Sequence, residues 1–353
     1  MKGATVRRLD LPHLAATLFD TPHMIRRSKL DVILAAVAPK LHSGALPVRA
    51  FADEDDYGSE PNEGFTVQNG VAIVPVLGTL VRRGSWLDAA SGLASYSGLK
   101  DCVAEALAEP DVKAVLLEID SNGGEAGGVF DLADEIRALS KRHRKPVWAH
   151  ANECAASAAY AIACAADRIW LARTGEVGSI GVICAHLDQS QADAKAGLRW
   201  TFIFEGDHKT WGNPHEPLDD EAEAALQADV HALYEMFVAH VAQYRGMTPQ
   251  AIRDTQADMF RGEAAITAGL ADRVGTLDQA VAALVRCVDN MSTSGGTAMA
   301  SKRGTSWLDA GPSAQPAAVR RNPSPKTSSR TISPKTRPKA KTTIRPPKAK
   351  TRT

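Results

Sequence analysis

Short apolar runs that alternate with helical patterns constrain the fold of this chain more than any other feature. Residues 71–78 and 112–119 are continuous apolar stretches of the length typical of buried strands. A helical pattern lies between them at 98–108, and another follows the second run, with apolar residues on one face at Val129, Leu132, Ile136 and Leu139. Strands that alternate with helices predict an α/β fold with a largely parallel sheet.

The second half of the chain continues the pattern. A long helix is expected after Lys209, because apolar residues step by three or four positions up to a stop near Gly246. The other predicted elements are a strand over 147–149, a small-residue helix over 155–166, a strand over 168–172, a turn back into the sheet over 178–183, a helix over 249–257 and a closing segment over 262–284.

The two ends differ from this body. Residues 1–45 carry a helical pattern broken at Pro12, Pro22 and Pro39, and residues 46–68 are polar and acidic. Residues 301–353 hold 14 Lys and Arg but one acid, and their frequent prolines break helices. We therefore predict a helical N-terminal segment with an acidic linker over 1–68, one α/β domain over 69–288, and a disordered basic tail rich in Pro, Ser, Thr and Lys over 289–353.

Composition excludes several classes of protein. No apolar run reaches the roughly 18 residues that span a bilayer, so no membrane contact is expected. The five cysteines are odd in number, widely spaced and without a CxxC pair. This usage argues against a disulfide framework and against a metal site, and it favours a reducing, cytoplasmic compartment.

A pair of glycines marks the first place where chemistry is expected. Gly123 and Gly124 follow the second apolar run and precede a helix. Backbone N–H groups can approach a ligand closely there, which suits an oxyanion or a phosphate, although a tight turn explains the pair equally well. The chain lacks a Walker lysine and a GxGxxG spacing at this point, so a nucleotide site is not expected.

Two further places offer a nucleophile and a base. Ser157 stands among alanines at an expected helix start, where it caps the helix, packs in the core or acts as a nucleophile. Nearby Cys154 is a second candidate nucleophile. Lys209 lies in a loop rich in Gly, Asn and Pro, where it is either a solvated lysine or, if buried beside a serine, a general base. His208 is the alternative base.

Taken in order, these motifs resemble the signal peptide peptidase A (SppA) family of serine proteases, which has the ClpP/crotonase-type fold with repeated βαβ units. The motifs are DSNGG at 120–124, ECAASAAY at 153–160, GSIGVI at 178–183 and the loop lysine. The segment LPHL at 11–14, the segment LFDTP at 18–22, and the HK and GNP motifs around 208–214 look like those of the capsid maturation proteases of lambda-type phages. The resemblance covers residues 8–285.

The resemblance implies roles for individual residues. Ser157 matches the nucleophile and Lys209 the general base of a Ser-Lys dyad, which leaves His208 as a neighbour. Gly123 and Gly124 match the loop that lines the cleft and donates to the oxyanion, and Ser179 matches a position that orients the lysine. The chain departs from the family pattern at Asn122, where proline is common, and at Ala158-Ala159, where two glycines are common.

The implied function is a serine endopeptidase of phage or prophage origin, without a cofactor, that cleaves capsid or scaffold proteins in the host cytoplasm or the procapsid. The resemblance also implies a homo-oligomer, and the basic tail suits a nucleic-acid or acidic partner. Two alternatives stay open: a cellular SppA-like peptidase that degrades signal-peptide remnants, and a non-enzymatic scaffold or minor capsid protein with an inactive protease domain. An acyl-CoA enzyme of the same fold would leave the Ser157 and Lys209 pair unexplained.

Overall fold

A computed structural model of the 353-residue chain describes residues 18–43, 64–82 and 93–295. The predicted acidic linker before residue 64 and the predicted basic tail after residue 295 lie outside these residues. The predicted domain boundaries fall at the end of strand β2 (Thr66–Gln68) and inside helix α11 (Leu277–Gly295). None of the helices within the described ranges is long and apolar enough to cross a membrane.

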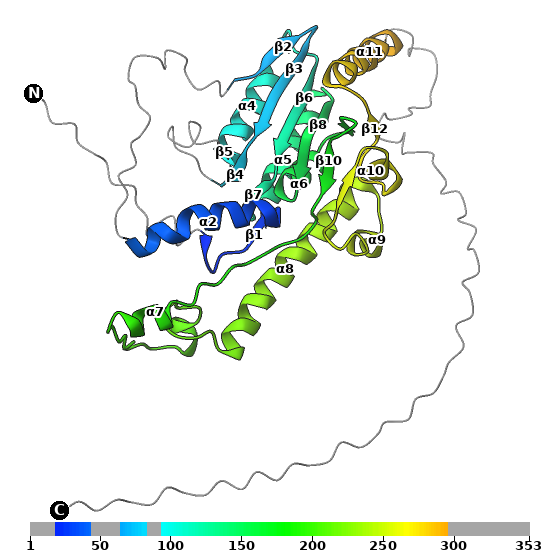
Figure 1. The fold of residues 1–353 in the computed structure, drawn as a ribbon. Helices are drawn as coiled ribbons and strands as arrows, with labels where there is room; N and C mark the ends of the chain where they lie inside the picture. The colour runs from blue at the N-terminus through cyan, green and yellow to red at the C-terminus, as the bar shows by residue number, and fades with distance from the viewer. Residues whose placement is uncertain (1–17, 44–63, 83–92, 296–353) are drawn as a thin grey trace, which may run out of the picture. The chain divides into compact units, whose positions relative to one another are not determined.

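The centre of the fold is a sheet whose middle strands are parallel (Figure 1). Strand β3 (Val71–Leu77) pairs with β6 (Ala114–Ser121), and β6 pairs with β8 (Val147–Ala156). Helices connect successive strands, so the predicted α/β class with repeated βαβ units is confirmed. The remaining strands of this sheet are β2 at one edge, β10 (Glu176–Gly178) and β11 (Met259–Arg261) at the other, and β9 (Arg168–Leu171) with β12 (Arg273–Val274) beside the first half of β8.

Helices cover both faces of the sheet, which explains why its strands read as continuous apolar runs. Alternate residues such as Val74 and Leu117 belong to the core on the side of the predicted amphipathic helices α4 (Tyr96–Ala108) and α5 (Val129–His143). Residues of the opposite parity, such as Leu116, pack with α11 in a second cluster. The predicted apolar face of α5 is buried at all four positions: Val129, Leu132, Ile136 and Leu139.

The predicted long helix is confirmed as α8 (Asp220–Arg245). Its N-cap is Asp219, whose side chain accepts a hydrogen bond from the Ala222 N–H at 2.7 Å. It ends at Gly246, which has a left-handed φ of 64°. The short helices that follow are α9 (Pro249–Arg253) and α10 (Glu263–Thr267).

Three sequence expectations are wrong in detail. The helix expected over 155–166 is α6 (Ala158–Cys164), because β8 continues to Ala156 through its pairing with β10. The segment expected to be helical at the N-terminus contains a strand, β1 (His23–Ile25). Pro39, expected to break a helix, lies within the bounds of α2 (Arg27–Ser43).

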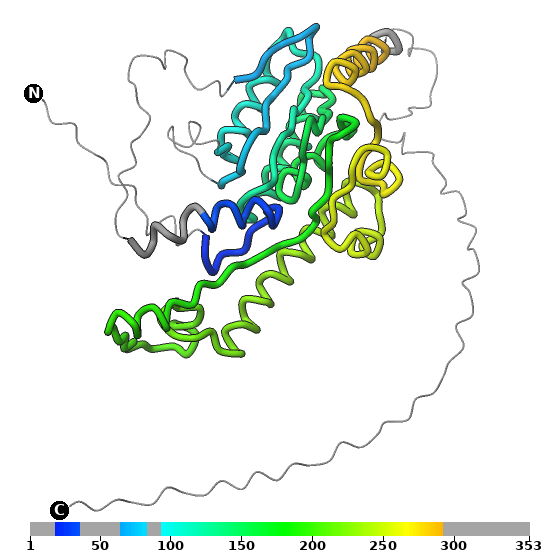
Figure 2. Tube along the Cα trace, in the orientation of Figure 1, coloured from blue at the N-terminus to red at the C-terminus, as the bar shows by residue number. Residues whose placement is uncertain are grey.

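A second, smaller sheet crosses the carboxyl end of the main one. Its order is β1, β7 (Gly123–Glu125), β4 (Thr79–Val81) and β5 (Leu93–Ser95). Strand β1 also touches the segment after β10 through a bridge between His23 and Ile183. Figure 2 follows this contact, with the N-terminal trace beside the green trace that leads toward α7 (Ser190–Lys195). The predicted glycine pair therefore forms a strand of this small sheet.

One buried histidine makes stability depend on pH. His240 in α8 lies with its Nε2 2.9 Å from the Ala161 carbonyl oxygen, and burial lowers the pKa of its ring. The unfolded chain binds a proton there more readily, so this contribution to stability is lost as the pH falls below about 6.5. We expect the urea midpoint to fall between about pH 7.5 and 5.5, and to fall less in His240→Gln. The exposed His231→Gln is the control, and an equal fall in all three proteins would contradict this account.

Candidate active site

Ser157 lies in a strained turn between β8 and α6. Its φ of 54° and ψ of −116° are rare for a residue other than glycine, and such strain costs about 1–3 kcal/mol. Ser157 stands at the N-cap position of α6, but its fully buried side chain makes no capping bond to that helix. A serine on a sharp strand-to-helix turn has the geometry of a nucleophile.

The loop after β10 supports this turn. The Ser157 N–H donates to the Gly178 carbonyl oxygen at 2.9 Å, and the Ser157 Oγ donates to the Gly181 carbonyl oxygen at 3.4 Å. Ser179 belongs to the same loop and has a positive φ of 53°; its N–H donates to the Asp258 carbonyl oxygen at 2.9 Å. Ser179 thus shapes the loop through its backbone. Within the described residues, no hydrogen bond joins its side chain to Lys209.

Gly123 faces the serine turn. A Cβ at this position would lie 2.2 Å from the Met24 carbonyl oxygen, 2.9 Å from that of Ala156 and 3.1 Å from the Ala158 nitrogen, so only glycine fits. Its own N–H donates to the Ser121 Oγ at 3.1 Å. The nearby N–H of Ala158 is the first of α6 and has no carbonyl one turn back within that helix.

Sequence reasoning missed Ala158. The signal was present, because Ala158 directly follows the candidate nucleophile at a helix start.

Gly124 lies against the backbone of β4. A Cβ there would lie 1.8 Å from the Leu80 carbonyl oxygen and 2.7 Å from the Leu80 nitrogen. Leu80 pairs with Gly124 across the parallel strands β4 and β7. The absence of a side chain at Gly124 therefore allows β7 to pack on β4.

Gly124→Val is expected to destabilise the fold by about 3 kcal/mol or more, because backbone atoms of β4 cannot move aside without breaking the small sheet. Urea unfolding of the full chain measures the effect. Gly127→Val is the matched control: it has an ordinary φ, its nearest neighbour is the flexible end of Arg82 at 3.9 Å, and its cost is expected to be below about 1 kcal/mol. A normal unfolding midpoint for Gly124→Val would show that β7 does not lie as close to β4 as described.

Lys209 lies far from this turn in its own chain. It belongs to the short helix η1 (Asp207–Thr210) in the segment 185–218, and its side chain is exposed. In Figure 1 the stretch between α7 and α8 lies well apart from α6. The alternative base His208 is also exposed and stacks on Trp211 with 3.7 Å between the ring centroids. One chain by itself therefore does not bring Ser157 and Lys209 together.

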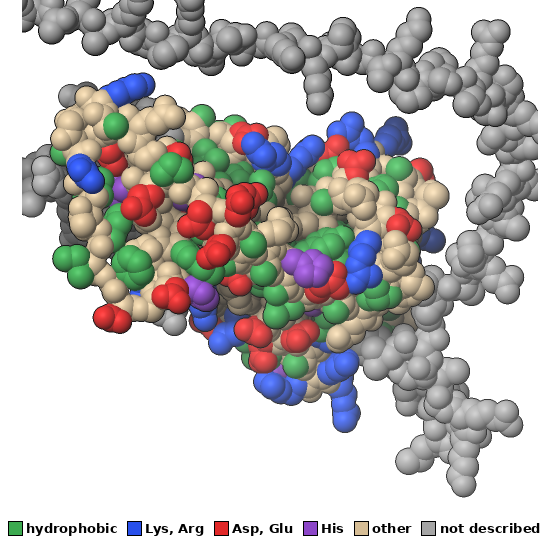
Figure 3. All heavy atoms as spheres, turned by 90° about the horizontal axis from the view of Figure 1, so that it is seen from below, with side chains coloured by type: hydrophobic (Ala, Val, Ile, Leu, Met, Phe, Trp, Pro, Cys, Tyr) green, Lys and Arg blue, Asp and Glu red, His purple; other side chains and the backbone are tan. Residues whose placement is uncertain are grey.

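The segment that carries Lys209 is unusually apolar for an exposed loop. Four of its large hydrophobic side chains are at least 49% exposed, and Ile203 is 98% exposed. Figure 3 shows hydrophobic side chains on the surface at the left-hand end, the side on which Figure 1 places α7. Exposed apolar clusters of this kind mark contact surfaces. The residues are Leu198, Trp200, Ile203 and Phe204.

Cys154 does not compete as a nucleophile. Burial raises the pKa of its thiol to about 11, and the Sγ donates to the Asn122 Oδ1 at 3.8 Å. A thiol with a raised pKa carries almost no thiolate at neutral pH, and the thiolate is the reactive form. The geometry therefore favours the serine.

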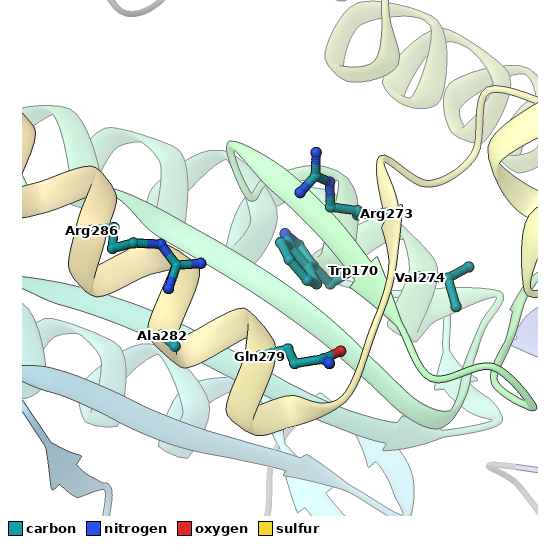
Figure 4. A pocket seen from close by; sticks show the side chains of 6 residues that line it. All are labelled: Trp170, Arg273, Val274, Gln279, Ala282 and Arg286. Carbon is teal, nitrogen blue, oxygen red and sulfur yellow. The ribbon is translucent and has the colours of Figure 1, made fainter.

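A separate cavity of about 320 Å³ lies between β9, β12 and α11 (Figure 4). Trp170, Arg273 and Arg286 line it, and Trp170 belongs to the core cluster on the α11 face of the sheet. Ser157 borders α6, whose residues belong to the cluster on the opposite face. This cavity is therefore not part of the site around Ser157.

Comparison with known proteins places the chain in a family. The profile of peptidase family S49 matches residues 140–289, a range that includes Ser157, Ser179 and Lys209. Capsid assembly protease C of Escherichia phage lambda is 35% identical over 299 residues, which cover 81% of this chain and 68% of that protein. Head-tail preconnector protein GP5 of Enterobacteria phage P21 is 36% identical over 303 residues, which cover 82% of this chain and 60% of that protein.

A solved structure of an enoyl-CoA hydratase/isomerase family member overlaps with a TM-score of 0.37 and 15% identity. The match covers 64% of this chain and 75% of that one. The similarity to the phage proteins confirms the resemblance stated from the sequence motifs. The chain belongs to peptidase family S49.

Proposed function

We propose that this protein is a serine endopeptidase whose nucleophile is Ser157. The observation that carries the proposal is the strained, buried turn that holds Ser157 between β8 and α6 without a capping role. Serine needs a base within hydrogen-bond reach to attack a peptide. The described part of a single chain offers no such base at Ser157, so the site needs a further group.

The base is Lys209 of a second copy of the chain. Lys209 is exposed and its segment presents apolar side chains, which is the arrangement expected if that segment docks on a neighbouring subunit. Docking would bury Lys209 beside the Ser157 turn of the neighbour, and burial favours the neutral amine that a general base requires. The Ser179 loop would then border the incoming amine.

The proposed chemistry follows from these positions. The neutral amine takes the proton of the Ser157 hydroxyl as Oγ attacks the peptide carbonyl carbon. The Ala158 N–H, beside Gly123, donates to the oxyanion that forms. The amine proton then passes to the leaving nitrogen as the C–N bond breaks. A water molecule, deprotonated by the same amine, hydrolyses the acyl-enzyme and frees Ser157.

The substrates proposed are proteins of capsid assembly, because the lambda relative is named a capsid assembly protease. The chain spans 60% of the P21 protein and 68% of the lambda protein. On this proposal the protein acts in the procapsid within the host cytoplasm. The basic segment after residue 301 is proposed to bind nucleic acid or an acidic protein. Cleavage of signal-peptide remnants and a non-enzymatic scaffold role are the alternatives.

Covalent labelling of the full chain tests the nucleophile directly. A fluorophosphonate probe is expected to add one label, located at Ser157 by peptide mass spectrometry, because the probe reacts only with activated serines. Ser97→Ala, at an exposed helical position, is the matched control and should label normally. Labelling of another serine, or equal labelling of Ser157→Ala, would remove Ser157 from the mechanism.

A further inference from the structure

The strand β1 lies beside the Ser157 turn, where a substrate peptide would have to bind. In the antiparallel pairing of β1 with β7, Met24 lies opposite Gly124 and Ile25 opposite Gly123. On its other side the His23 N–H donates to the Ile183 carbonyl oxygen at 2.7 Å, and the Ile183 N–H donates back at 2.9 Å. The strand thus lies between β7 and the segment after β10, and both contain residues that contact or border the Ser157 turn.

The backbone of Met24 occupies the space next to the nucleophile. Its carbonyl oxygen is 2.2 Å from where a Cβ on Gly123 would stand, and that point is 3.1 Å from the Ala158 nitrogen. Met24 and Ser157 are both fully buried. An extended peptide that added to the edge of β7 would need the same main-chain positions.

Ion pairs and backbone bonds fasten both ends of this strand. Before it, the Asp20 Oδ1 is 2.8 Å from the His186 Nδ1, and the Asp20 N–H donates to the Ala185 carbonyl oxygen at 2.9 Å. After it, the Arg26 Nη1 is 2.9 Å from the Glu176 Oε2. The Arg26 N–H donates to the Asn122 carbonyl oxygen at 2.8 Å. These contacts come from residues on both sides of the strand: Asn122 on the side of β7, and Glu176, Ala185 and His186 on the side of β10 and the segment that follows it.

We propose that residues 20–26 are an internal occupant of the peptide groove and must leave before a substrate peptide binds. The proposal rests on the proposed function only in taking this groove as the substrate groove. A strand tethered to the same chain competes with an added peptide at a high effective concentration. The groove is therefore unoccupied in only a fraction of the molecules. The apparent Kd of any added peptide is the intrinsic Kd divided by that fraction.

Peptide binding to the full chain tests the occupant. The probe is a fluorescent peptide with the sequence of residues 18–26, which retains the groups that fasten the internal strand. Fluorescence polarisation is measured on Ser157→Ala, so that nothing is cleaved. Adding Arg26→Gln removes one fastening pair and is expected to tighten the apparent Kd about three- to fivefold, since exposed to half-buried ion pairs contribute modestly.

Arg27→Gln is the matched control. Arg27 is the next residue and is exposed, and within the described residues its one ion pair is with Asp31 on its own helix, so its loss should leave the Kd unchanged. Asp20→Asn is a second, independent variant that should tighten binding as Arg26→Gln does. Hydrogen exchange at the His23 amide should quicken in both variants.

Equal affinities in all of these proteins, or no peptide binding in any of them, would overturn the proposal. The two proposals fail separately. Normal labelling of Ser157, without a difference in peptide affinity between the variants, would refute only the proposal that residues 20–26 occupy the groove. Tighter peptide binding in the variants, without labelling of Ser157, would refute only the proposal that Ser157 is the nucleophile of a peptidase.

Discussion

Ser157→Ala is expected to abolish peptide cleavage by the full chain, lowering kcat by about 10⁴-fold or more. The change removes the oxygen that forms the acyl-enzyme and leaves the substrate groove intact. The fold should be retained, because the Ser157 side chain makes a single long hydrogen bond of 3.4 Å. Cleavage of β-casein, followed by mass spectrometry, measures the loss, and urea unfolding checks the fold.

The control for this prediction is Ser97→Ala, which should cleave casein at the rate of the unchanged protein. A second comparison is Cys154→Ala, which separates the two nucleophiles that the sequence offered. If Cys154→Ala is inactive and Ser157→Ala retains more than a small fraction of the activity, the nucleophile is the thiol of Cys154.

The fold could be predicted from the sequence because its signals are local and repeated. Buried parallel strands read as apolar runs at 71–78 and 112–119, and the face of α5 reads as a helical stripe. The α/β class with repeated βαβ units that the sequence predicted is that of the chain. The boundary between β8 and α6 was placed three residues early, because alanine-rich stretches suit a helix and carry no signal for the pairing with β10.

The strand β1 could not be predicted in the same way. Three residues, His23–Ile25, are too few for a periodic pattern. They form a strand only because β7 and Ile183 offer unpaired edges on either side. Such pairing is tertiary, so the proline at position 22 and the helical pattern around it predicted a helix with a break.

The candidate site could be predicted residue by residue but not in its arrangement. The motifs identify Ser157, Gly123 and Lys209, and the structure brings the first two together. Lys209 lies apart from Ser157 in the single chain, and the contact with a second copy that we propose would leave no periodic signal in one sequence. The exposed side chains around it, such as Trp200 and Ile203, read as ordinary apolar residues until their exposure is seen.

Lys209→Ala is expected to lower casein cleavage by about 10³-fold or more, and the lost activity should return when this variant is mixed with Ser157→Ala. Each variant keeps the half of the dyad that the other lacks. If the lysine of one copy serves the serine of the next, random mixing restores both groups in about a quarter of the sites. The recovered rate should therefore approach a quarter of that of the unchanged protein, measured after the two variants are unfolded and refolded together.

Two comparisons make this prediction decisive. Lys195→Ala changes an exposed lysine on the same segment and should keep full activity, which separates the base from a general loss of positive charge. His208→Ala tests the other base that the sequence offered. Recovery of activity on mixing requires that the two groups come from different copies, because a dyad within one chain is broken in every molecule of the mixture. A mixture that stays inactive, while each variant forms oligomers of normal mass, would place Lys209 beside the serine of its own chain or outside the reaction.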